Sequence, residues 1–277
     1  MLDSEIIIIF IGAFGLIAGS FVNALIWRVR EQSKHTSSKD LSIINGRSIC
    51  PNCKHKLASI DLIPVISWLS LRGKCRYCHK SISSQYPLVE LAMAILFILS
   101  YAFWPQPVSG IEAVEFAIWL VLLTGLFALF IYDLKWQILP SRILYPLLAI
   151  AALLALINII NSGEPFTALV SLFFSVLIGG GLFFVIYQVS GGKWIGGGDV
   201  RLGWLLGLIA GTPAKSVLVI FLAAILGSLL SIPLLATKRL KRTSTLPFGP
   251  FLITGLILVE FFGTQIVNWY FNLLVKY

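Results

Sequence analysis

The chain carries a succession of long apolar segments, and this feature limits its possible folds more than any other. A helix that spans a bilayer needs about 20 apolar residues. Eight segments are candidates: about 5–27, 86–104, 112–132, 141–160, 166–189, 199–211, 213–236 and 247–273. Of the whole chain, 58% is hydrophobic and only 12% is charged, whereas soluble domains have about 25% charged residues. The sequence predicts an all-α polytopic membrane protein with about eight transmembrane helices.

The sixth segment is shorter than the others. Its roughly 13 residues would extend about 20 Å as a helix, which is too short to cross a bilayer upright. It is therefore either a half-helix or a helix that begins earlier, inside the preceding glycine run. Two prolines, Pro146 and Pro233, fall inside other segments and predict kinks there.

The Lys and Arg residues predict how the chain is oriented. With the N-terminus outside, the inner segments are 28–86, 133–142, 190–201 and 237–246. These segments contain all 21 Lys and Arg residues except Lys215 and Lys276. Basic loops face the cytoplasm, so this orientation is favoured. The basic residues behind the net charge of +9 lie in these few loops rather than along one face, which argues against a nucleic-acid partner and for a membrane lipid environment.

Three regions follow from this topology. Residues 1–27 form a first transmembrane helix with its N-terminus outside. We expect this helix to be a retained anchor, because acidic rather than basic residues precede it and no small-residue cleavage site follows. Residues 28–86 form a cytoplasmic loop, and residues 87–277 form a seven-helix membrane region.

The cytoplasmic loop contains all four cysteines of the chain, as two CxxC pairs: Cys50, Cys53, Cys75 and Cys78. This spacing is typical of a tetrahedral structural zinc site. The alternative of two disulfides is disfavoured in the reducing cytoplasm. His55 and His79 follow the pairs closely, but four thiolates already complete a ligand set. We expect the ion to fold a small zinc-binding loop domain that has little core of its own.

Two aspartates lie at the cytoplasmic ends of apolar segments. Asp133 ends one segment, and Asp199 follows the glycines Gly196, Gly197 and Gly198. A carboxylate at the margin of hydrocarbon is a functional candidate. Two neighbouring aspartates that share one proton can hydrolyse an amide, and the glycines allow a backbone bend and close approach of a substrate strand. The pattern therefore predicts a membrane aspartic hydrolase.

Other interpretations remain open from the residues alone. Asp133 could cap the next helix, and Asp199 could be the N-cap of a helix beginning at Val200. As a pair they could instead relay protons or ions in a transporter, or the protein could be a membrane scaffold with a zinc-bound docking loop. Glu90, just inside the second span, is expected to pair with a loop Arg or Lys. Glu260 lies deep in the last span with no assigned role.

Several motifs resemble the type IV prepilin peptidases, which are membrane aspartic proteases of the GxGD type. The resemblance covers most of the chain. It is carried by Gly19-Ser20-Phe21-Val22-Asn23 with Trp27-Arg28, the two CxxC pairs around Ile63-Pro64-Val65-Ile66-Ser67-Trp68, Tyr86-Pro87-Leu88-Val89-Glu90, Asp133 with Leu139-Pro140, Gly196-Gly197-Gly198-Asp199, and Pro247-Phe248-Gly249-Pro250. Arg201 departs from the usual Lys, and Gly203-Trp204 are bulkier than the usual small residues.

The resemblance implies a function that spacing alone does not. Such enzymes reside in the bacterial inner membrane and remove the short basic leader from prepilins or pseudopilins at its cytoplasmic face. Many of them then methylate the new N-terminus with S-adenosylmethionine, an activity linked to the zinc loop. The resemblance implies that Asp133 and Asp199 are the catalytic pair, that the glycines before Asp199 support the active site, and that the four cysteines bind zinc.

Overall fold

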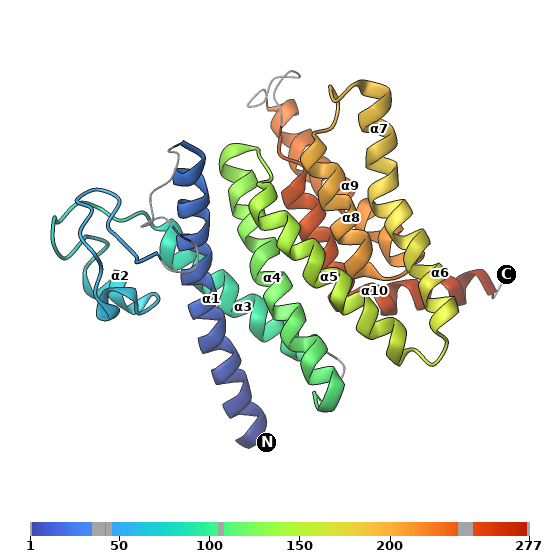
Figure 1. The fold of residues 1–277 in the computed structure, drawn as a ribbon, viewed down its shortest axis with the longest axis horizontal. Coiled ribbons are helices and arrows are strands. Elements are labelled where there is room, and N and C mark those ends of the chain that lie inside the picture. Colours follow the sequence, from blue (N-terminus) through green and yellow to red (C-terminus); the bar gives the residue numbers. More distant parts are fainter. Residues whose placement is uncertain (1, 35–41, 43–45, 105–107, 238–245, 276–277) are drawn as a thin grey trace. The chain divides into compact units, whose positions relative to one another are not determined.

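The computed structural model describes residues 2–34, 42, 46–104, 108–237 and 246–275 (Figure 1). The regular secondary structure of these residues is helical, apart from two isolated β-bridges. The chain divides into two compact units, unit 1 (Met1–Pro105) and unit 2 (Gln106–Tyr277). Several basic residues used to predict the topology, at positions 39, 238, 239, 241, 242 and 276, lie outside the described residues.

The all-helical prediction is confirmed. Within the described residues, seven helices are long and apolar enough to cross a membrane. They are α1 (Leu2–Lys34), α3 (Gln85–Phe103), α4 (Gly110–Trp136), α5 (Ser141–Asn161), the continuous α6–η3–α7 (Pro165–Val176, Leu177–Gly181 and Leu182–Ser190), α9 (Pro213–Ala236) and α10 (Gly249–Val275). The predicted sixth segment is α8 (Gly197–Ala210), which has 14 residues and begins inside the glycine run.

Unit 1 pairs α1 with α3 through a small-residue face. A Cβ on Gly15 would lie 2.6 Å from the Cα of Ala94, and one on Gly19 would lie 2.5 Å from the Cα of Glu90. Two glycines four residues apart let helix backbones approach closely in a membrane. The GxxxG pattern of α1 therefore brings it against the first turns of α3.

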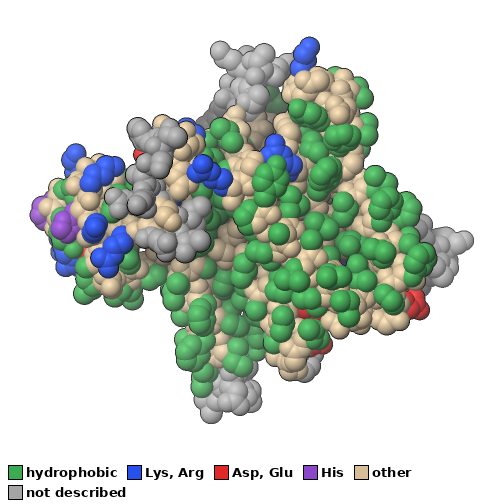
Figure 2. All heavy atoms as spheres, viewed as in Figure 1, with side chains coloured by type: hydrophobic (Ala, Val, Ile, Leu, Met, Phe, Trp, Pro, Cys, Tyr) green, Lys and Arg blue, Asp and Glu red, His purple; other side chains and the backbone are tan. Residues whose placement is uncertain are grey.

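Unit 1 also holds the two short helical turns η2 (Ser59–Leu62) and α2 (Ile66–Ser70). They belong to residues 46–84, which we call the cysteine module. Figure 2 shows Lys, Arg and His side chains gathered on this module, whereas hydrophobic side chains cover much of the helical surface. The contrast agrees with a polar module attached to spans that face hydrocarbon.

Unit 2 is organised around α8. This helix contacts α5, α6, α7, α9 and α10, and eight of its residues are buried: Val200, Leu202, Gly203, Leu205, Leu206, Gly207, Ile209 and Ala210. A short helix surrounded in this way can be shielded from lipid without itself crossing the bilayer. Its burial also places Asp199, near its beginning, among the surrounding helices.

A second GxxxG pair lies in α8. A Cβ on Gly203 would lie 2.4 Å from the carbonyl oxygen of Gly179, and one on Gly207 would lie 2.7 Å from the Cα of Val176. Both distances are too short for any side chain. Next to this crossing, the Trp204 ring packs against Gly180. A Cβ atom on Gly180 would overlap the Cδ1 atom of that ring.

The π-helical segment η3 was not predicted, because the sequence suggested one uninterrupted helix over 166–189. Its residues include the glycines at positions 179–181, which allow the local widening that a π-turn requires. Such segments occur mostly as single turns inside α-helices. Here the widened turn lies against the small-residue face of α8.

Replacing Gly207 with Leu should destabilise unit 2, because the added side chain meets the backbone of α6. We expect a loss of about 1–3 kcal/mol from overpacking, measured as a lower melting temperature of the protein in detergent. The matched control is Gly227→Leu, since a Cβ on Gly227 meets only the Phe251 ring at 3.6 Å, an ordinary contact. Equal melting temperatures for the two variants would contradict the close crossing of α8 and α6.

Candidate active site and metal centre

Asp133 lies in the last turn of α4. The helix ends because Gln137 adopts a left-handed conformation (φ 53°, ψ 40°), and its N–H donates to the carbonyl oxygen of Asp133 at 2.8 Å. The chain then passes through Leu139 and Pro140 into α5. Only 4% of Asp133 is exposed, so its carboxyl group faces the interior of unit 2.

Asp199 lies in the first turn of α8. Gly196 is the N-cap, and the Asp199 side chain accepts a hydrogen bond from the Gly196 N–H. The backbone N–H of Asp199 in turn donates to the Gly196 carbonyl at 3.0 Å. The possibility that Asp199 is itself the N-cap is therefore wrong, because the helix begins two residues earlier. Its carboxyl group is half-buried.

The ends of three helices meet around Leu139. A Cβ on Gly198, at the start of α8, would lie 3.0 Å from the Cβ of Leu139. A Cβ on Gly249, at the start of α10, would lie 3.6 Å from Leu139 Cδ2 and 2.5 Å from Asp133 Oδ2. The structure therefore brings together the end of α4 and the starts of α8 and α10. The Asp133 and Asp199 carboxyl groups lie close enough to interact electrostatically.

Gly249 also contributes a backbone hydrogen-bond donor to the site. Its backbone N–H donates a hydrogen bond to the Asp133 carboxyl group. As the first residue of α10, it offers an N–H that has no partner within its own helix. Sequence reasoning missed this contact, and the available signal was a glycine between two prolines at the start of the last span.

Arg201 positions the start of α8 against α5. Its guanidinium donates a hydrogen bond to the Ser141 hydroxyl and lies over the Tyr145 ring, 5.8 Å from the ring centroid. Gly197 is its neighbour, with a built Cβ 3.8 Å from Arg201 Nη2. A planar guanidinium suits this combined hydrogen bond and stacking better than an ammonium group.

The arrangement supports one kind of chemistry best. Two carboxyl groups on separate helices can hold one water between them, with one group accepting a proton and the other donating a hydrogen bond to a carbonyl. The helix N-termini of α8 and α10 add backbone N–H groups that favour developing negative charge. These features fit the hydrolysis of an amide.

The cysteine module contains two knuckles built in the same way. In the first, Cys50 N–H donates to the His55 carbonyl and Lys54 N–H donates to the Cys50 carbonyl, both at 2.9 Å. The second knuckle repeats both bonds, from Cys75 N–H to the Lys80 carbonyl at 2.9 Å and from His79 N–H to the Cys75 carbonyl at 3.0 Å.

Each knuckle has a left-handed residue after its second cysteine, Lys54 (φ 60°) in the first and His79 (φ 57°) in the second. One β-bridge also closes each knuckle. This turn aims both thiols of each pair at one point.

The four thiol groups fit a metal ion. Their Sγ atoms all lie within 4.8 Å of one another, and Cys50 Sγ lies 3.9 Å from Cys78 Sγ. A tetrahedral zinc ion with bonds of about 2.3 Å requires sulfur atoms about 3.8 Å apart. No disulfide joins the four cysteines. Burial opposes ionisation of Cys50, yet hydrogen bonds from the N–H groups of Cys53 and Asn52 lower its pKa to about 7.

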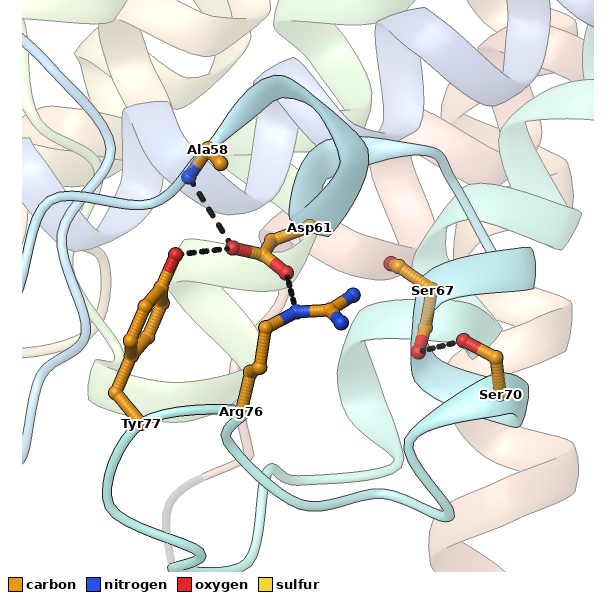
Figure 3. A network of polar contacts seen from close by, with 6 residues as sticks. All are labelled: Ala58, Asp61, Ser67, Ser70, Arg76 and Tyr77. Atoms are coloured by element: carbon orange, nitrogen blue, oxygen red, sulfur yellow. Dashed lines mark hydrogen bonds and ion pairs between the residues drawn. The ribbon is translucent and has the colours of Figure 1, made fainter.

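A polar network braces the module beside the cysteines (Figure 3). Asp61 accepts hydrogen bonds from Arg76 Nε at 2.7 Å, from the Tyr77 hydroxyl at 3.0 Å and from the Ala58 N–H at 3.1 Å. Burial would raise the pKa of Asp61, but these donors hold it below its usual value. The His55 ring stacks on Tyr77 with centroids 3.7 Å apart, so it serves the packing of the knuckles.

Removing the thiols should release the ion and unfold the module. We expect about one zinc per wild-type chain by elemental analysis and none in Cys50→Ser/Cys75→Ser, because one ligand from each knuckle is lost. The control Ser70→Ala, on an exposed hydroxyl of α2, should keep the metal. A double variant that retains a full equivalent of zinc would contradict the four-thiolate site.

The two remaining membrane acids occupy different settings. Glu90 was expected to pair with a loop Arg or Lys, but it accepts hydrogen bonds from the Val65 N–H at 2.7 Å and from Ser20. Glu260 lies 4.0 Å from Lys215 Nζ, between α10 and the start of α9. Neither acid belongs to the group around Leu139.

Comparisons with known proteins match the two regions that contain these residues. Residues 13–104 match the bacterial peptidase A24 N-terminal domain, and residues 120–232 match the type IV leader peptidase family. The second match includes both aspartates, and the first includes all four cysteines. No solved structure matches the chain.

Curated relatives match over nearly their whole length. A prepilin leader peptidase/N-methyltransferase of Dichelobacter nodosus is 32% identical, over 96% of this chain and 95% of that protein. The Bacillus subtilis (strain 168) protein of the same name is 30% identical, over 94% and 96%. A type 4 prepilin-like proteins leader peptide-processing enzyme of Escherichia coli is 33% identical, over 87% and 88%. The chain therefore belongs to the type IV leader peptidase family, the peptidase A24 family.

Proposed function

We propose that this protein is a prepilin leader peptidase in which Asp133 and Asp199 form the catalytic pair. The observation that carries the proposal is the convergence of both carboxyl groups at the ends of α4 and α8, beside the start of α10. One aspartate accepts a proton from the attacking water while the other, protonated, polarises the scissile carbonyl. Leu139 and the glycines 196–198 position the pair. Because the chain belongs to a peptidase family, we favour a peptidase over the alternative of a proton or ion transporter.

The substrate is a prepilin or pseudopilin, which has one membrane helix and a basic leader. The protein lies in the bacterial inner membrane with its N-terminus outside, so that the aspartates and the cysteine module are cytoplasmic. This orientation is supported by the distribution of Lys and Arg. The substrate helix lies beside the enzyme in lipid and unwinds locally at its cleavage site so that the amide can be attacked.

The metal is a structural zinc ion held by Cys50, Cys53, Cys75 and Cys78. It folds the cysteine module and leaves no open coordination position for substrate. The second activity is N-methylation of the new N-terminus with S-adenosylmethionine. Support for methylation comes from the relatives that are named for both activities.

One experiment tests cleavage and methylation together. The detergent-solubilised protein is incubated with a synthetic prepilin, with and without S-adenosylmethionine, and the products are analysed by mass spectrometry. We expect the leader to be released in both reactions, and the mature product to gain one methyl mass only when the methyl donor is present. An intact substrate under both conditions would refute the peptidase, and an unmodified mature product would refute the methylation.

A further inference from the structure

The cysteine module exposes a row of large apolar side chains. Ile60, Ile63, Ile66 and Leu69 recur every third residue along the segment that contains η2 and α2, and all four are exposed. We call these four residues the apolar row. Ile66 is 64% exposed and Leu69 is 61% exposed, about as much as Phe14 (63%) on the surface of the membrane span α1. An exposed apolar patch rimmed by polar residues marks an interaction site.

The other side of the same segment packs inside unit 1. Trp68 lies between Ile66 and Leu69 in the sequence, but its Nε1 donates to the Ile82 carbonyl at 3.1 Å. A Cβ on Gly73 would lie 2.9 Å from its ring, so the indole is held within the module. The segment therefore has an inner side that stabilises the module and an outer side, the apolar row, that the described residues leave uncovered.

A hydrogen bond fixes the height of the apolar row relative to the spans. The N–H of Val65, between Ile63 and Ile66, donates to Glu90 Oε2 at 2.7 Å. Glu90 is in the second turn of α3, which begins at Gln85, so it lies about 7.5 Å along the helix from its start. The apolar face of an interfacial helix is buried about 5–10 Å into the boundary between headgroups and acyl chains. The apolar row is therefore tied to a span at the depth of that boundary.

The polarity of the module changes in the same direction as that of the spans. In Figure 1, α2 lies lower than the start of α3, towards the N-terminal half of α1. Figure 2 shows hydrophobic side chains along the lower edge of the module and Lys, Arg and His side chains above them. The apolar edge thus points the same way as the apolar part of α1.

The rest of the module surface is basic. The module contains seven Lys and Arg residues but one acid, Asp61, which is engaged in the network of Figure 3. Four thiolates on one zinc ion would remove two of the excess positive charges, so the module stays cationic. Arg72 and Lys74 closely follow α2 and are exposed, and Lys54 Nζ lies 5.8 Å from the centroid of the Trp27 ring in α1. Such residues near a membrane surface are attracted to anionic headgroups.

We propose that the cysteine module docks on the bilayer, with the apolar row inserted among the lipids and its Lys and Arg residues against anionic headgroups. In the orientation proposed above, this surface is the cytoplasmic leaflet. Both ends of the module join membrane spans, so the bilayer is always within reach and no partner has to be recruited. Lipid fits better than a protein partner, because the row lies at bilayer depth and is flanked by cationic side chains.

Photocrosslinking identifies what covers the apolar row. A benzophenone amino acid replaces Ile66 in one sample and Lys80, an exposed residue of the second knuckle, in another. Each zinc-loaded full chain is illuminated in nanodiscs that contain phosphatidylglycerol and phosphatidylethanolamine, and mass spectrometry identifies the attached molecule. We expect phospholipid adducts at position 66 and at least tenfold fewer at position 80. Attachment of position 66 to another part of the chain or to a second copy, or equal lipid labelling at both positions, would overturn the inference.

Hydrogen exchange tests the two parts of the docking surface separately. Amides of residues 59–71 should exchange at least tenfold more slowly in nanodiscs with phosphatidylglycerol than in nanodiscs of neutral phosphatidylcholine. Ile66→Ser/Leu69→Ser should lose this protection, and Arg72→Gln/Lys74→Gln should reduce the difference between the two lipids. The control Ser70→Ala should exchange as wild type does.

Zinc content and melting temperature in detergent show whether each variant is folded. A folded Ile66→Ser/Leu69→Ser protein with wild-type protection would overturn the inference, as would equal exchange of the wild-type protein in both lipids. Prepilin cleavage is measured in the same nanodiscs. A protein that cleaves prepilin but shows no lipid contact at the apolar row would lose the docking surface and keep the peptidase.

Discussion

Asp133→Asn and Asp199→Asn should each lower the rate of prepilin cleavage by at least about 10⁴-fold, the scale seen when a member of a catalytic set is removed. The amide side chain is nearly the same size as the carboxyl group, so the helix ends around Leu139 should keep their places. It cannot accept the proton of the attacking water or share one with its partner. The rate is measured in detergent with a synthetic prepilin, by mass spectrometry of the released leader.

The matched control for these variants is Glu112→Gln. Glu112 is an exposed acid in the first turn of α4, at the opposite end of the helix from Asp133. It should cleave at the wild-type rate, and all variants should insert and melt normally. If either aspartate variant cleaved within tenfold of wild type, that aspartate would have no chemical role.

Gly249→Ala should lower cleavage by about 100-fold, because the new methyl group would lie too close to a carboxyl oxygen of Asp133. The built Cβ lies 2.5 Å from Asp133 Oδ2, so the carboxyl group must move and its bond from the Gly249 N–H must lengthen. Displacements of about 1 Å in a catalytic group can cost this much. Since Gly249 has an ordinary helical position at the start of α10, the loss should appear in kcat rather than in folding.

Gly227→Ala serves as the control for Gly249→Ala. It adds the same methyl group to α9, where the nearest atom outside the helix is a Phe251 ring carbon at 3.6 Å. Its cleavage rate should equal that of wild type. A Gly249→Ala protein with wild-type kcat would mean that Asp133 does not work from the position seen here.

Local patterns in the sequence were enough to predict most of the candidate site. Asp133 and Asp199 could be recognised because each ends or begins a long apolar segment, where an acid is costly. The four cysteines were recognisable because a CxxC pair forms a tight knuckle by itself, and both knuckles have the same hydrogen bonds. The short helix α8 was also predicted, because the apolar segment after the glycine run is too short to span a bilayer.

The contacts that required knowledge of the packing were missed. Nothing in the hydropathy of α10 indicates that the Gly249 N–H reaches Asp133, because that contact depends on how three helix ends meet. The π-turn η3 lies where Gly203 of α8 approaches Gly179, a contact between separate segments that a local sequence pattern does not show. The positive φ of Val65 (61°) could not be foreseen either, because its N–H donates to Glu90, a residue of another helix.

The central claim is that Asp133 and Asp199 act as one catalytic unit, and the double variant Asp133→Asn/Asp199→Asn tests it most directly. Its cleavage rate is compared with both single variants on one synthetic prepilin. Because the second carboxyl group is useless once the first is lost, the account predicts that the double variant cleaves no more slowly than either single variant. A double variant that still cleaves near the wild-type rate, or two losses that multiply, would contradict it.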